Sequence, residues 1–142
     1  MILLPPALLQ IIVDAAEAAY PEECCGLLVG HGEGRGDLTV TGVEPSPNMA
    51  GGKRFEVSAQ LRFDVMRALE GGPMRIVGHY HSHPDHAAAP SPRDLEMAWE
   101  PDLVWLITSV MDGRAAQTTA HIPLSDGSGF GELKLISNGE TS

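Results

Sequence analysis

Residues 78–84 read Gly78-His79-Tyr80-His81-Ser82-His83-Pro84, and residues 91–94 read Ser91-Pro92-Arg93-Asp94. The first run is typical of a β-strand that begins near residue 75 and is ended by proline. Side chains two residues apart on a strand point to the same face of the sheet, so the three histidines should form a ladder on one face. Three imidazoles followed by a carboxylate are hard to explain by packing alone and predict a metal site.

The spacing alone leaves the ligand set open. Either His79 with His81, or His81 with His83, could supply two nitrogen ligands, and Asp94 could supply an oxygen. Such a set leaves a fourth position for water, which distinguishes a catalytic zinc site from a closed structural one. Ser91 and Asp94 also suit the first turn of a helix, with Ser91 as N-cap. The two interpretations are compatible, because a helix start is a rigid mount for a ligand.

Hydrophobic periodicity predicts helices and strands on both sides of this segment. We expect helices over residues 5–20, 61–69 and 91–99 and strands over residues 24–30, 38–43, 54–58, 75–83, 103–110, 117–122 and 129–136. This order predicts the α/β (α+β) class, as a single domain over residues 1–136 with a mixed β-sheet flanked by helices. Residues 137–142 should form a disordered tail. Trp99 and Trp105 are expected in the core.

Composition limits the possible partners and the compartment. The chain has 142 residues, a hydrophobic fraction of 43% and a charged fraction of 20%, as in ordinary globular proteins. Its net charge of −10 argues against nucleic acid or an anionic membrane as partner. Cys24 and Cys25 are adjacent and are the only cysteines, which excludes a disulfide framework and agrees with a reducing compartment. We therefore expect a cytoplasmic location.

His81-x-His83, seven residues, Ser91, two residues and Asp94 together resemble the JAMM motif of the MPN-plus (Mov34/MPN/PAD-type) zinc metalloproteases. Residues 23–30, with Glu23 three positions before a glycine, resemble the glutamate-bearing strand of that family. The resemblance implies a cytidine-deaminase-like MPN fold and selects His81, His83 and Asp94 as ligands of one Zn²⁺ per chain.

The same resemblance implies roles for other residues. Glu23 would accept the proton of the attacking water and pass it to the leaving amine, and Ser91 would donate a hydrogen bond to the oxyanion. Glu22 is the competing base, and the family's spacing favours Glu23. His79 and Ser82 are expected beside the ligands or in the wall of the groove.

The resemblance also implies a substrate class. Family members release ubiquitin-like proteins from conjugates or trim their tails, and the short segment between Asp94 and residue 103 leaves no room for long insertions. The chain is therefore expected to be a compact prokaryotic-type isopeptidase or peptidase. It should cut amide bonds at the Gly-Gly tail of a ubiquitin-like or sulfur-carrier protein, with no nucleic-acid or membrane partner.

Other functions remain as alternatives. A non-catalytic MPN-type scaffold is one, although such relatives usually lack the metal motif. A non-haem iron enzyme with two histidines and a carboxylate is another. A cysteine hydrolase is disfavoured because Cys25 lies in an apolar strand, where its pKa should rise. A zinc deaminase would need a Pro-Cys-x-x-Cys run, which the chain lacks.

Overall fold

The computed structural model describes residues 1–33, 37–50 and 54–137 and places the described strands in one mixed sheet. The strands are β1 (Ile2–Leu3), β2 (Cys25–Glu33), β3 (Asp37–Ser46), β4 (Arg75–Pro84), β5 (Val104–Met111), β6 (Arg114–Pro123), β7 (Phe130–Leu133) and β8 (Leu135–Ile136). Their spatial order is β7-β6-β5-β4-β2-β3-β1-β8. β4 pairs in parallel with β5, and β1 pairs in parallel with β3 and β8, whereas the other pairs are antiparallel.

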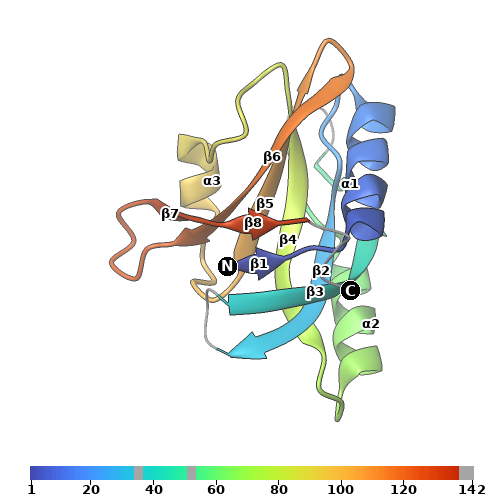
Figure 1. Ribbon diagram of the computed structural model, residues 1–142, viewed down its shortest axis with the longest axis vertical. Helices are drawn as coiled ribbons and strands as arrows, with labels where there is room; N and C mark the ends of the chain where they lie inside the picture. The colour runs from blue at the N-terminus through green and yellow to red at the C-terminus, as the bar shows by residue number, and fades with distance from the viewer. Residues whose placement is uncertain (34–36, 51–53, 138–142) are drawn as a thin grey trace.

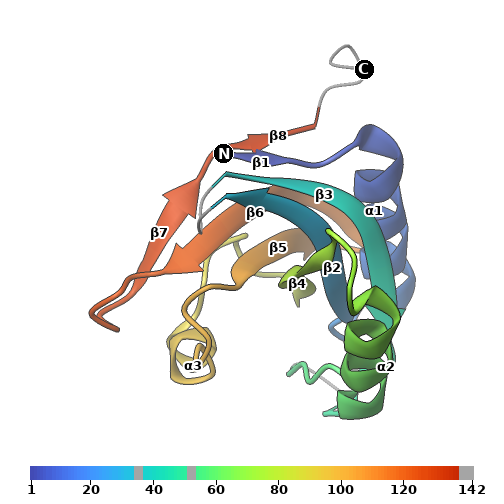
Figure 2. The ribbon, with the colours of Figure 1, turned by 90° about the horizontal axis from the view of Figure 1, so that it is seen from below.

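Helices lie on both faces of this sheet, as Figures 1 and 2 show. They are α1 (Pro6–Ala19), α2 (Ala59–Leu69) and α3 (Pro92–Glu96). α1 packs on one face, where Ile12 and Leu28 belong to the main hydrophobic core. Leu27 and Val29, which flank Leu28 on β2, pack on the other face with Val65 of α2. This alternation is what a strand buried on both faces requires, and the predicted sheet flanked by helices is confirmed.

The two edges of the sheet meet near the end of the chain. β7 and β8 stand at opposite ends of the strand order, yet only Lys134 separates them. The N–H of Ile2 donates to the carbonyl of Lys134 at 2.8 Å, which fastens β1 beside this crossing. The prediction of one strand over residues 129–136 is therefore wrong, because the segment divides between two partners, β6 and β1. β1 was not predicted either, because two residues are too few to show an alternating pattern.

Three other expectations are wrong. Residues 54–58 form an isolated bridge between Asn48 and Val57 instead of a strand. Trp99 is 76% exposed, whereas Trp105 is 2% exposed and lies in the core as expected. The third helix ends at Glu96, short of the predicted residue 99.

Most of the predicted tail, residues 138–142, lies outside the described residues. No helix in the described part of the chain is long and apolar enough to cross a lipid bilayer.

Close packing of β4 against β5 makes a glycine necessary at position 78. A Cβ atom at Gly78 would lie 2.3 Å from the carbonyl oxygen of Val104, so Gly78→Ala requires a backbone shift between the two central strands. We expect it to lower the free energy of unfolding by about 1–3 kcal/mol, the usual cost of overpacking. Gly42→Ala is the matched control, because its Cβ would meet Val29 at an ordinary 3.7 Å. Denaturant unfolding should separate the two variants, and equal stability would contradict this packing.

Candidate metal centre

β4 carries the histidine ladder through the middle of the sheet. The strand lies between β2 and β5, with His81 opposite Cys25 of β2 and Ile107 of β5. His81 and His83 are 1% and 7% exposed. Both lie near the carboxyl end of β4, next to its parallel partner β5, which is the edge where ligands bind in open α/β sheets.

Asp94 reaches the two histidines from the first turn of α3. Its Oδ1 lies 3.6 Å from Nε2 of His81, and its Oδ2 lies 3.2 Å from Nε2 of His83. The two histidine Nε2 atoms are 3.0 Å apart. Potential ligand atoms of all three residues lie within 4.8 Å of one another, and all three residues are buried. The structure therefore brings together the three residues that the motif singles out.

Ser91 fixes Asp94 in this position through a capping box. The N–H of Asp94 donates to Oγ of Ser91 at 3.1 Å, and the N–H of Ser91 donates to Oδ2 of Asp94 at 2.8 Å. Both members of the helix-start pattern are thus satisfied, as the N-cap interpretation predicted. Oγ of Ser91 acts here as an acceptor, and no hydrogen bond in the described residues uses its proton.

The donor set fits a metal cation. Nδ1 of His83 lies 2.9 Å from the carbonyl of Ala87, and a carbonyl can only accept, so Nδ1 carries the proton and Nε2 presents a lone pair. Nε2 of His81 lies 3.0 Å from Nε2 of His83, so a proton or a cation must lie between the two nitrogens. Burial lowers the pKa of His81, which favours the neutral imidazole that binds metals. The buried group of His81, His83 and Asp94 could therefore hold a metal ion.

The charge state of Asp94 agrees with this. Burial opposes its ionisation, but hydrogen bonds with His81 and His83 outweigh that effect and hold the pKa of the carboxyl well below its usual range. The pKa of His83 is raised, because Asp94 and the Ala87 carbonyl outweigh burial. A metal ion must therefore compete with a proton on His83, and binding should weaken at low pH.

His79 lies outside this group. Its ring packs against Trp105, with centroids 4.4 Å apart, and against Phe55 at 5.6 Å. Burial, with the neighbouring His81 and Arg62, lowers the pKa of His79 to about 3. His79 is therefore a neutral part of an aromatic wall behind His81, whose own ring stacks on Phe55 at 4.0 Å.

Glu23 reaches the same site from the residue pair that precedes β2. Ser82, between the two histidines, accepts the N–H of Cys24 at 2.8 Å and donates its own N–H to the Cys24 carbonyl at 3.2 Å. The side-chain amide of Asn48 donates to the Glu23 carbonyl at 3.0 Å. These bonds fix the Glu23 backbone beside β4. Asn48 lies in a loop without a recognisable motif, so nothing in the sequence marks it as part of the site.

Glu23, His83, Ser91 and Asp94 line one pocket of about 380 Å³. Burial raises the pKa of the Glu23 carboxyl to about 7, with His83 opposing the shift and Asp94 adding to it. A carboxyl with this pKa can exchange a proton near neutral pH. Glu22, the competing candidate, is exposed.

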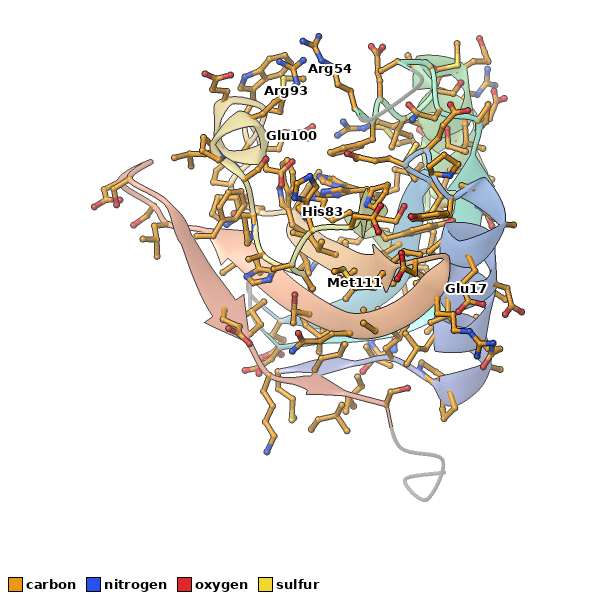
Figure 3. All side chains as sticks on the ribbon, turned by 90° about the horizontal axis from the view of Figure 1, so that it is seen from above. Glu17, Arg54, His83, Arg93, Glu100 and Met111 are labelled. Carbon is orange, nitrogen blue, oxygen red and sulfur yellow. The ribbon has the colours of Figure 1, made fainter. Side chains whose placement is uncertain are left out.

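Arginines stand at the rim of this pocket. Figure 3 shows Arg54 and Arg93 on the same side of the sheet as His83, and both arginine side chains line the pocket. The entrance therefore carries positive charge in a chain whose net charge is −10.

The cysteine-hydrolase alternative gains no support from the site. Burial raises the pKa of the Cys25 thiol to about 11, so the thiol stays protonated and is a poor nucleophile near neutral pH.

Comparisons with known proteins find relatives that match most of the chain. The family model described as prokaryotic homologs of the JAB domain matches residues 5–121. A protein of Haloferax volcanii named desampylase is 39% identical over 117 residues, covering 79% of each chain. The CysO-cysteine peptidase of Mycobacterium tuberculosis is 34% identical over 108 residues, covering 74% of this chain and 70% of its own. A solved structure from Desulfitobacterium hafniense, 27% identical, has a TM-score of 0.83 and covers 97% of this chain and 93% of that one.

The geometry predicts one divalent metal ion per chain. His81→Ala, His83→Ala and Asp94→Ala should each empty the site, because each removes one of three ligands. His79→Ala should retain the metal, since His79 lies outside the group. Elemental analysis after metal loading and dialysis measures the occupancy. Loss of metal from His79→Ala with retention in His83→Ala would contradict this ligand set.

Proposed function

The chain belongs to the family of prokaryotic homologs of the JAB domain, and from that premise we propose that it is a zinc-dependent peptidase or isopeptidase. Its substrates are ubiquitin-like or sulfur-carrier proteins, cut at an amide bond of the C-terminal tail. The observation that carries this proposal is the buried group of His81, His83 and Asp94, of which His83 and Asp94 line one pocket with Glu23. The names of the desampylase and the CysO-cysteine peptidase support hydrolysis of carrier-protein bonds.

His81, His83 and Asp94 would hold the zinc, with two nitrogen donors and one oxygen donor. When bound in such an open site, Zn²⁺ polarises a carbonyl and lowers the pKa of its water to about 7. The chain supplies the geometry. Asp94 is fixed by the capping box with Ser91, and His83 is oriented by the Ala87 carbonyl. Ligands already in place need little rearrangement when metal or substrate arrives.

Glu23 is the proton carrier in this proposal. Its carboxylate takes the proton of the attacking water and delivers it to the leaving amine nitrogen, so one side chain serves both halves of the reaction. Burial supports the role, because it raises the pKa of Glu23 to about 7. Ser82 and Asn48 act on the backbone at positions 23 and 24 and hold the carboxylate over the pocket.

Ser91 has two tasks. Its Oγ accepts the N–H of Asp94, which keeps the ligand in place. Its proton then points to a different acceptor, and we assign that acceptor as the oxygen of the carbonyl under attack.

The substrate tail is expected to bind as an added strand along residues 54–57. The N–H and carbonyl of Glu56 are bonded to Asn48 and Met49 on one side of this segment. Backbone groups alternate in direction along an extended chain, so those of Phe55 and Val57 face the opposite way. They have no hydrogen-bond partner among the described residues. A tail paired with this edge would run toward the pocket, which Phe55 helps to line.

Glu23→Gln tests the proton carrier. The amide keeps the size of the side chain but cannot take a proton, so turnover should fall about a hundredfold or more, while zinc content stays at one per chain. Glu22→Gln is the matched control and should have near wild-type turnover, because Glu22 is an exposed side chain next to the same strand. Cleavage of a carrier conjugate, followed by mass spectrometry, gives both rates. Equal rates for the two variants would remove Glu23 from the mechanism.

A second prediction concerns the tail of the substrate. A narrow pocket accepts glycine where larger side chains would clash, so changing the tail glycines of a carrier to Ala or Val should lower turnover severely. The globular part of the carrier is kept constant in this series. An unrelated unfolded protein is the control and should hardly be cut. Indifference to the glycines would show a general peptidase instead of a carrier-specific enzyme.

A further inference from the structure

Residues 85–89 form a loop that joins β4 to the segment before α3, and we call it the clamp loop. Its sequence is Asp85-His86-Ala87-Ala88-Ala89. The loop lines the metal pocket through His86, Ala87 and Ala89. The carbonyl of Ala87 accepts the Nδ1–H of His83 at 2.9 Å and so decides which nitrogen of that imidazole faces the metal. Three of its five residues are alanines, whose side chains cannot hold the loop by hydrogen bonds.

The clamp loop is held instead by side chains of neighbouring strands. Oγ of Ser109 on β5 donates to the His86 carbonyl at 2.6 Å. Oγ1 of Thr119 on β6 donates to the Ala88 carbonyl. The carbonyls on both sides of Ala87 are therefore fixed by hydroxyls that the proposed mechanism does not use.

Thr119 is itself held by His121. Nε2 of His121 lies 2.8 Å from Oγ1 of Thr119. Because the single hydroxyl proton is directed at Ala88, Nε2 of His121 must be the donor of this second bond. The result is a directed chain of hydrogen bonds from His121 through Thr119 to the clamp loop.

The start of the loop is anchored as well. Asp85 has a φ of 58°, which is unusual for a residue other than glycine. Its carboxylate accepts the hydroxyl of Tyr20 at 2.7 Å and the N–H of Asp112 at 3.1 Å, and its N–H donates to the Val110 carbonyl at 2.7 Å. These bonds hold the backbone in a conformation that the residue would not adopt freely.

Register explains why Ser109 and Thr119 can act together. Ser109 is paired with His83, and Thr119 is paired with Ile107, the partner of His81. Paired residues project to the same face of a sheet, so both hydroxyls lie on the face of the metal ligands. Thr108 and Thr118 are paired one position along these strands and project to the opposite face, where their hydroxyls bond to each other at 2.9 Å.

We propose that Ser109 and Thr119 are positioning residues for the metal site. They fix the carbonyls of His86 and Ala88, and thereby aim the Ala87 carbonyl at Nδ1 of His83. This inference rests on the proposed metal site but not on the identity of the substrate. Hydrogen-bond partners of metal-bound histidines typically contribute tenfold to a hundredfold to metal affinity. Removing a support of such a partner should act at the low end of that range.

The test measures Zn²⁺ affinity by competition with a chromophoric chelator. Thr119→Val keeps the shape of the side chain and loses the hydroxyl, and it should weaken Zn²⁺ binding about tenfold, as should Ser109→Ala. Thr119→Ser restores the hydroxyl and should bind within about threefold of wild type. Thr118→Val is the matched control, because it also removes one hydroxyl from β6, on the face away from the metal. It should leave the affinity within about twofold of wild type.

Two further readouts separate positioning from general loss of stability. Thermal unfolding of the metal-free protein should be affected similarly by Thr118→Val and Thr119→Val. The visible spectrum of the Co²⁺-loaded protein should change only in Thr119→Val and Ser109→Ala. Equal metal affinity in Thr118→Val and Thr119→Val, or no rescue by Thr119→Ser, would overturn the inference. Tight wild-type metal binding without cleavage of any carrier would instead contradict the proposed function alone.

Discussion

Two imidazole nitrogens and one carboxylate converge on a single buried point, and this arrangement requires a proton or a cation between them. Nε2 of His83 is committed as an acceptor by the Ala87 carbonyl, and Nε2 of His81 faces it at 3.0 Å. Asp94 adds a negative charge, because its hydrogen bonds with the two histidines keep its carboxyl ionised. Without a cation or a shared proton these groups would repel one another in a largely buried site, where water screens charges poorly. Most other features of the site serve to hold this convergence in place.

The contacts that stabilise the helices and strands of the fold also position the side chains of the site. The helix start at α3 is capped by Ser91, and the same capping box fixes Asp94. The pairing of β4 with β2 fixes where His81 and His83 lie along the sheet. Ser82 extends that pairing, because its hydroxyl oxygen accepts a hydrogen bond from the N–H of Cys24, next to Glu23. The central part of the sheet and the pocket therefore depend on the same strand register.

Sequence alone predicts the parts of this protein that are encoded locally. The histidine ladder and Asp94 predict a metal site, and the resemblance to the JAMM motif selects His81, His83 and Asp94, the group that the structure brings together. Alternation and helix patterns give the fold class. Three features were not predicted, two of them because they depend on partners elsewhere in the chain. β1 exists only because β3 and β8 pair with it. The expected strand over residues 54–58 is only a bridge, because the Asn48 side chain takes its hydrogen bonds. Trp99 is exposed because α3 ends before it.

X-ray absorption at the zinc edge of the metal-loaded protein tests the central claim most directly. We expect two imidazole nitrogens at about 2.0–2.1 Å with the remaining ligands oxygen, in a four-coordinate site. Substitution of His79 should leave that spectrum unchanged, because its ring packs against Trp105 and Phe55. Sulfur scattering at about 2.3 Å, which would place Cys24 or Cys25 on the metal, or a third imidazole would contradict the account.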